Sequence, residues 1–189
     1  MKKFFQFAIM AAVACAFAAC SGNGAGGSVE TETLSHDYAN LRLSVDVPKD
    51  KGYKIVESDS LPAEWKEWDS DSYYLYLVTE KAVFFFGEGF CSFDKFADWK
   101  AFCKEKFDAQ TGYFNTYEEL QVAGREAVKF DKYEEQAYSY MLNTDDFAEK
   151  QTIGELKVVA TQGTIDEALA DPEVKAIFES IKYSVRPEE

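Results

Sequence analysis

Two dense apolar runs, separated by only two charged residues, constrain the fold of this chain more than any other feature. The first run spans residues 73–79 and reads YYLYLVT, and the second spans residues 82–87 and reads AVFFFG. Neither run alternates apolar with polar residues, so each predicts a β-strand that is buried on both faces. Glu80 and Lys81 make the tight connection between them. The sequence therefore predicts a hairpin inside a sheet, with something covering each face.

Further strands are expected on both sides of this hairpin. Residues 41–47 alternate apolar with polar side chains, which is typical of a half-buried strand, and Pro48 ends it. The polar segment 58–71, which contains Pro62, is expected to be a loop or a short helical turn. The remaining strands are expected at residues 53–56, 127–130, 138–142 and 156–160.

Helices are expected in the middle and at the end of the chain. Ser92 is a candidate N-cap for a helix that starts near Phe93. Thr164 and Glu167 form a capping-box pattern, and Asp171 before Pro172 is a second helix start. The last helix follows the i, i+3, i+4, i+7 rule through Val174, Ile177, Phe178 and Ile181. About seven strands, mostly joined as hairpins, with these helices predict an α+β fold: an antiparallel sheet covered by helices on both faces.

Three packing features of the domain resemble those of a known family. They are the strand segment 43–48 that closes on proline, the Gly-x-x-Ala turn at 124–127, and the helix end with a Ser-Ile pair at 177–181. Over residues 34–184 the chain resembles the Mog1/PsbP-like family. The resemblance implies an α/β/α sandwich. Its better-known members are binding and assembly factors, so the resemblance implies no catalytic residues.

The first residues are typical of a secretory signal. Lys2 and Lys3 form a positive start, and from Phe4 to Ala19 the only polar residue is Gln6. This apolar run is shorter than the roughly 20 residues that a spanning helix needs. We therefore exclude residues 1–19 from the fold as a signal peptide.

The end of this signal resembles the lipobox of bacterial lipoproteins. Residues 17–20 read FAAC, with two small residues before the cysteine, and SGNGAGG follows as a flexible tether. The resemblance implies that the Cys20 thiol is lipidated and that Cys20 becomes the new N-terminus. A rival site ends at Cys15, and an ordinary signal peptidase would cleave after residues 16–18. We expect the lipid to anchor the chain in the bacterial cell envelope, at the outer membrane facing the periplasm or the cell surface.

The mature chain is expected to contain one domain. Cys20 and the tether occupy residues 20–28, and residues 29–189 form a single α+β domain with no second linker. The chain has 20 Lys+Arg against 34 Asp+Glu, a formal charge of −14. This charge argues against nucleic acid as a partner, because phosphate binding needs a basic surface.

No motif for catalysis or for a cofactor is present. His36 is the single histidine and lies close to the tether, where a rigid catalytic arrangement is not expected. Acidic doublets occur, but nothing in the sequence selects a catalytic pair, and the segment from Asp69 to Glu80 fails the EF-hand pattern at positions 5 and 6. We predict no enzyme activity, no cofactor and no metal. The doublets are Asp69 with Asp71, Glu118-Glu119, Glu134-Glu135 and Asp145-Asp146.

Cys91 and Cys103 are the two thiols of the domain. An exported protein permits a disulfide. With a helix that starts near Phe93, however, the two residues lie roughly 15 Å apart along the axis, and a disulfide tolerates Cα separations up to about 7 Å. Two reduced, buried cysteines are the favoured interpretation.

Three aromatic residues are candidates for an interaction surface. Trp65 and Trp68 lie in an acidic loop, where they either form a sugar-stacking platform or cap the sheet. Phe102 lies opposite the apolar face of the middle helix. It is an isolated exposed residue, a contact for the segment 113–114, or a contact for a partner.

These observations favour a lipid-anchored, non-catalytic binding or assembly module with a protein partner. The alternative is an envelope protein that binds or processes glycans through the loop tryptophans and carboxylates.

Overall fold

The computed structural model describes residues 29–38, 41–70, 72–90, 92–112, 114–122, 124–146 and 152–186. The expected signal peptide, Cys20 and the tether lie outside the described residues, as do Asp71, Cys91 and Tyr113. The described part of the chain forms ten strands in two antiparallel sheets, with three α-helices and three short 3₁₀ helices.

The smaller sheet joins the two ends of the domain. It has the order β1-β2-β10, formed by β1 (Thr31–Tyr38), β2 (Leu41–Pro48) and β10 (Lys182–Val185). Lys182 lies opposite Ser44, so residues far apart in the sequence are neighbours in this sheet.

The larger sheet has the order β3-β4-β5-β9-β8-β7-β6. Its strands are β3 (Ile55–Glu57), β4 (Tyr73–Val78), β5 (Ala82–Phe90), β6 (Glu118–Val122), β7 (Arg125–Tyr133), β8 (Ala137–Leu142) and β9 (Thr152–Ala160). The helices are α1 (Phe96–Asp108), α2 (Ile165–Ala170) and α3 (Pro172–Ser180), and the 3₁₀ helices are η1 (Lys49–Lys51), η2 (Ser58–Ser60) and η3 (Ala63–Trp68).

The central hairpin β4–β5 is buried on both faces, as the sequence predicts. Its side chains point alternately to the two faces of the larger sheet. We call the face with Phe84 and Phe86 face A, and the face with Val83 and Phe85 face B. All four side chains are no more than 1% exposed.

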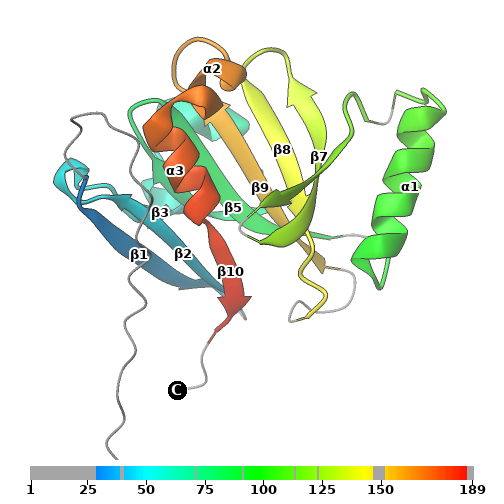
Figure 1. Ribbon diagram of the computed structural model, residues 1–189, viewed down its shortest axis with the longest axis horizontal. Coiled ribbons are helices and arrows are strands. Elements are labelled where there is room, and N and C mark those ends of the chain that lie inside the picture. Colours follow the sequence, from blue (N-terminus) through cyan, green and yellow to red (C-terminus); the bar gives the residue numbers. More distant parts are fainter. Residues whose placement is uncertain are drawn as a thin grey trace, which may run out of the picture.

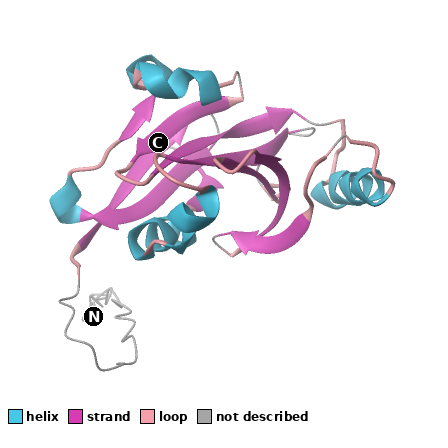
Figure 2. Cartoon of the chain, turned by 90° about the horizontal axis from the view of Figure 1, so that it is seen from above, coloured by secondary structure: helices cyan, strands magenta, loops and turns pink. Residues whose placement is uncertain are grey.

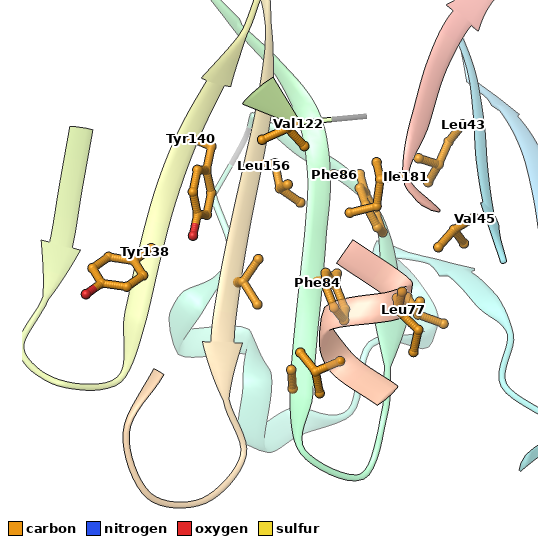
Figure 3. Packing of buried hydrophobic residues seen from close by; sticks show 14 of the residues in the cluster. Leu43, Val45, Leu77, Phe84, Phe86, Val122, Tyr138, Tyr140, Leu156 and Ile181 are labelled. Carbon is orange, nitrogen blue, oxygen red and sulfur yellow. The ribbon is translucent and has the colours of Figure 1, made fainter. Parts of the chain in front are cut away.

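Face A is covered mainly by the smaller sheet and by the two C-terminal helices. Leu43 and Val45 of β2 belong to one apolar cluster with Phe84 and Phe86 of β5, and Ile177 of α3 joins them. Figure 3 shows the β5 side chains directed at β2 and at the short helix that precedes β10. This cluster is the largest apolar core of the described domain.

Face B is covered differently at its two ends. At the β3–β4 end, Leu61, Trp65 and Trp68 pack against Tyr76 and Phe85. At the β7 end, the buried side of α1 packs on the sheet around Val128 and Phe130. Figure 1 shows α1 at the β7 edge of the molecule, away from α2 and α3.

The predicted α+β sandwich with a helical layer on each face is wrong, because the protein is mostly β. A second antiparallel sheet occupies much of face A, and the helices are short and lie at the periphery of the strands (Figure 2). Two strands of that sheet had little sequence signal: β1 has only two apolar residues, Leu34 and Tyr38, and β10 has only four residues. Their place in the fold depends on pairing with β2.

The start of the middle helix also differs from the prediction. Helix α1 begins at Phe96, and its N-cap Lys95 makes no side-chain cap hydrogen bond. Instead, Asp145 Oδ1 accepts a hydrogen bond of 2.9 Å from the Phe96 N–H. A carboxylate from a distant loop therefore takes the place of the predicted local cap at Ser92.

The two C-terminal helix starts are as predicted. Thr164 and Glu167 form a complete capping box at α2. At α3 the Asp171 side chain accepts from the N–H groups of Glu173 and Val174, with Pro172 in the first turn. Among the described residues, no helix combines the length and the apolar character needed to cross a bilayer.

Candidate functional site

Polar side chains form a cluster on face B, between the two apolar patches that bind η3 and α1. The cluster, which we call the Lys157 cluster, consists of Tyr73, Asp131, Tyr133, Ser139, Glu155 and Lys157. Lys157 is only 8% exposed and Ser139 is fully buried. Buried ionisable groups are unusual in a protein core and mark candidate functional sites.

A β-bulge in β4 directs Tyr73 into this cluster. Tyr73 lies opposite Gly87, whereas Leu75 lies opposite Phe86, so Tyr74 is the extra residue. Strict alternation along β4 would place Tyr73 on face A with Leu75 and Leu77. The bulge places it on face B instead, where it packs with Tyr76 and Phe85.

A second bulge, in β7, has the same effect on Asp131. Lys129 lies opposite Tyr140 and Asp131 lies opposite Ser139, so Phe130 is the extra residue. Without the bulge Asp131 would share a face with Lys129. With it, Asp131 becomes the direct cross-strand neighbour of Ser139 on face B. Two irregularities in two strands thus converge on one cluster, and bulges often re-aim side chains at functional sites.

The Lys157 ammonium group lies among aromatic rings. Its Nζ is 4.8 Å from the ring centre of Tyr73, 5.2 Å from that of Tyr133 and 6.0 Å from that of Phe85. It also donates a hydrogen bond of 2.9 Å to the carbonyl oxygen of Trp68. Cation–π contacts and this carbonyl offset part of the cost of removing the charge from water.

Glu155 and Tyr73 are joined across a glycine. The Tyr73 hydroxyl donates a hydrogen bond of 2.6 Å to Glu155 Oε1. Gly87 lies between them in the sheet, opposite both residues. A Cβ at Gly87 would lie 1.7 Å from the carbonyl oxygen of Ser72, so only glycine fits there.

Ser139 lies at the centre of the cluster. Its cross-strand neighbours are Asp131 on one side and Lys157 on the other. The hydroxyl lies near the phenols of Tyr73 and Tyr133 and acts to lower their pKa values, against the larger rise that burial causes. It nevertheless has no hydrogen-bond partner of normal geometry among the described residues.

Burial moves the pKa values of the three charged groups toward their neutral forms. Desolvation raises the pKa of Glu155 and that of Asp131, and it lowers the pKa of Lys157. The same cause raises the pKa of Tyr73 and that of Tyr133. The cluster is therefore a set of coupled, partly desolvated charges.

The structure places the two loop tryptophans on the sheet. Both are half-buried in η3 and pack against the apolar patch around Phe85. Trp68 also meets the ring of Tyr133 edge-on, with 6.3 Å between ring centres. Trp68 therefore lies at the border of the Lys157 cluster, whereas the contacts of Trp65 are those of a residue that caps the sheet.

Phe102 is half-buried rather than exposed. Its ring centre is 5.4 Å from that of Phe93, and the Lys106 ammonium lies 5.2 Å from it. It belongs to the rim of the apolar patch under α1, to which Phe114 also contributes. Contacts within the protein thus account for part of its surface.

The other candidates lie apart from this cluster. His36 is in β1, 3.2 Å from Glu57 Oε1. Of the acidic doublets, Glu118 and Glu119 each form an ion pair with a lysine, and Asp71 lies outside the described residues. Cys103 is buried in α1 beside Trp99, and a Cys91–Cys103 bond involves a residue outside the described part of the chain. The described residues contain no group of three or more His, Cys, Asp or Glu that could hold a metal ion.

Two of the hollows on the described surface serve as examples of cavities away from this cluster. One, of about 430 Å³, is lined by Lys81, Gln162, Glu167, Ala168, Ala170 and Asp171. The other, of about 330 Å³, is lined by Gly124, Arg125, Glu126, Asn143, Asp145 and Asp146. Neither contains a tryptophan of the predicted sugar platform.

Sequence reasoning missed the Lys157 cluster, although signals for part of it were present. Gly87 and Gly89 interrupt an otherwise bulky strand, and Glu155 and Lys157 sit two apart in an apolar one. Such breaks in a strand pattern mark bulges or close approaches. Nothing local, however, relates them to Tyr73 or Asp131.

Comparison of the chain with protein-family models, with curated proteins and with solved structures finds no match. The Mog1/PsbP-like resemblance therefore stays a prediction without support from these comparisons, and the α/β/α sandwich that it implied is wrong.

Proposed function

We propose that this protein is a lipid-anchored component of the bacterial cell envelope that acts as a non-catalytic binding or assembly module for a protein partner. The observation that carries the proposal is the FAAC sequence at residues 17–20, which follows an apolar signal and precedes a Gly/Ser-rich segment. With a formal charge of −14, the chain gains no attraction to anionic headgroups. The lipid on Cys20 would supply the attachment.

The hydrogen bonds of the Lys157 cluster give its charged groups a structural role in the domain. Lys157 bonds to the Trp68 carbonyl and Tyr73 bonds to Glu155. Both ties help to hold residues 58–73 on face B. Ionisable groups that are engaged in this way serve the architecture of the domain.

The anchor is tested by mass spectrometry of the native N-terminus and by fractionation of two variants. We expect a lipid-modified Cys20 as the first residue of the mature protein. Cys20→Ala should lose both the modification and membrane retention, while the matched variant Cys15→Ala should keep both. A mature chain that begins elsewhere without lipid would refute the proposal.

Glycan binding is the second candidate, and one observation favours it. Tyr133 is 39% exposed and lies against Trp68, with Asp131 and Glu155 in the same cluster. Aromatic faces beside carboxylates suit the apolar and polar sides of a sugar ring. Titration with soluble peptidoglycan fragments should then change tryptophan fluorescence in a saturable way. Trp68→Ala should abolish this change, and Trp99→Phe, in α1, should keep it. A flat titration of the wild type rejects this candidate.

A further inference from the structure

Strand β1 is the longest strand with an unpaired edge in the described part of the chain. It has eight residues, whereas the other outer strands of the two sheets, β3, β6 and β10, have three, five and four. Its register with β2 is continuous from Thr31 to Tyr38, without a bulge, and it contains neither lysine nor proline. Sheets usually protect their edges by these features, because a bare edge pairs readily with another strand. Figure 1 shows β1 at the margin of the molecule, next to β2 and far from α1.

The backbone groups of alternate β1 residues point away from β2. Glu30 accepts a hydrogen bond of 3.0 Å from the Lys49 N–H, so the even-numbered residues that follow direct their N–H and C=O groups at β2. The odd-numbered residues from Thr31 to Asp37 therefore direct theirs outward. Among the described strands, β1 pairs with β2 alone. Its outer edge thus presents a row of backbone donors and acceptors to a further strand.

The core-facing side chains of β1 are complementary to a second, antiparallel copy of the same strand. Pairing with Leu34 at a two-fold axis keeps the same face of both strands toward the core, since side chains alternate. Glu32 of one copy then lies opposite His36 of the other. Glu32 has no ion-pair partner among the described residues. The imidazole can receive it through Nδ1, because its Nε2 is the atom that lies 3.2 Å from Glu57.

Polar contacts on the opposite face of β1 continue in the same register. The Thr33 hydroxyl donates a hydrogen bond of 2.5 Å to Asp46 Oδ1, and the hydroxyls of Ser35 and Ser44 are 2.9 Å apart. These bonds form a row that joins β1 to β2. Thr33 of one copy would lie opposite Ser35 of the other, so the row of hydroxyl groups would extend into the second copy.

We propose that β1 pairs with β1 of a second copy of this chain, antiparallel and about a two-fold axis at Leu34, so that two three-stranded sheets become one continuous sheet. A register centred on Ser35 fits less well, because it puts Glu32 opposite Tyr38. The contact uses the same surface on both copies and closes on itself, so it ends at a dimer.

The inference does not depend on the lipid anchor. It is tested with full-length protein purified in an excess of detergent micelles, so that separate copies do not share a micelle. Sedimentation velocity over a dilution series should show a reversible equilibrium between monomer and dimer. A monomer at every concentration would overturn the proposal.

Proline at an outward-facing position tests which edge forms the dimer. Ser35→Pro removes a backbone donor that points away from β2, so the monomer should keep its sheet, which thermal unfolding checks. A symmetric dimer loses this donor twice, so its dissociation constant should rise by about tenfold or more. The matched variant Gln121→Pro, at the exposed edge strand β6, should leave the constant unchanged. A folded Ser35→Pro protein that dimerises as tightly as the wild type would contradict the assignment.

Cysteine variants test the register without a change in the backbone. Opposite residues of a non-hydrogen-bonded antiparallel pair have Cα atoms about 4.5 Å apart, which a disulfide tolerates. Glu32→Cys mixed with His36→Cys should therefore form an intermolecular disulfide between positions 32 and 36 on oxidation, identified by peptide mapping. The absence of this bond, or an equally efficient bond formed by Glu32→Cys alone, would overturn the proposal.

Discussion

Face A and face B of the same sheet are built in opposite ways. Face A has one continuous apolar cluster that joins both sheets and the two C-terminal helices. Face B has two smaller apolar clusters, one under η3 and one under α1. The Lys157 cluster lies between them, with three charged groups, Asp131, Glu155 and Lys157, whose pKa values are shifted by burial.

The two faces are expected to contribute differently to the free energy of unfolding. Burial of apolar surface on face A supplies a large favourable free energy. Burial of charged groups on face B costs part of that free energy. Buried charges are often retained where they fix the structure or take part in function. We therefore expect substitutions on face A to cost more stability, and those on face B to change pH response and binding.

The largest effect is expected for Phe84→Ala on face A. Phe84 is fully buried, with its ring stacked 6.2 Å from that of Phe86. The cavity should cost about 3–5 kcal/mol in the free energy of unfolding, measured by urea titration. The matched variant Phe85→Ala on face B should lose less, since the polar cluster beside it can admit water. An equal or greater loss for Phe85→Ala would break the comparison.

Gly87→Ala should have the next largest effect. The added Cβ collides with the backbone carbonyl of Ser72, so residues 70–73 must move. We expect a loss of about 1–3 kcal/mol, as for other overpacked sites, with a change in tryptophan fluorescence as η3 shifts. Gly154→Ala in β9, where the nearest atom is the side-chain methyl of Thr144 at 2.9 Å, is the control and should lose less. A Gly87→Ala protein as stable as the wild type would show that this end of face B is loosely held.

Phe102→Ala should cost about 1–2 kcal/mol. Phe102 is half-buried at the rim of the α1 patch, and a fully buried phenylalanine contributes about 1.5–3 kcal/mol. Urea titration of the variant tests whether Phe102 contacts the rest of the domain or a partner protein. A loss in this range indicates an internal role; unchanged stability, together with loss of co-purification of a protein cross-linked to the wild type, indicates a partner.

Glu155→Gln should change the free energy of unfolding least at neutral pH, by no more than about 1 kcal/mol. The substitution removes the cost of burying a carboxylate, and this gain offsets the weaker hydrogen bond from the Tyr73 hydroxyl. Its signature is the pH profile. The folded pKa of Glu155 is above its ordinary value of 4.5, so the wild type binds this proton more tightly when folded. The stability from this group is fully present below pH 4.5 and is lost as the pH rises through the folded pKa. Glu155→Gln should flatten this loss, whereas the exposed variant Glu64→Gln should keep it.

The sequence pattern predicted strands correctly where both faces of the strand are buried. The runs at β4 and β5 lack polar residues, so their double-sided burial followed from composition alone. The caps of α2 and α3 also followed, because a cap is made by residues three apart in the sequence. The α1 cap did not, since it comes from Asp145 in a distant loop.

The residues of the Lys157 cluster were even harder to predict from local sequence. Strict alternation of side chains along β4 and β7 would place Tyr73 and Asp131 on face A. The bulges at Tyr74 and Phe130 place both on face B instead. A bulge forms where pairing and packing with the neighbouring strands favour an extra residue, and that information is not local. Trp68 was a sequence candidate, but its relation to Lys157 and Tyr133 was not visible.

The sequence by itself determined the elements whose physics is local: the double-sided hairpin and the amphipathic C-terminal helix. The export and lipidation signal stays a prediction. The tertiary structure decided what covers the hairpin, because any apolar surface can satisfy a buried strand and the chain ends supplied a sheet where helices were expected. It also decided that residues 73, 131, 139, 155 and 157 meet on face B. Hydrophobic periodicity fixes which side of a strand is buried, but only pairing across the sheet fixes which polar groups are buried together.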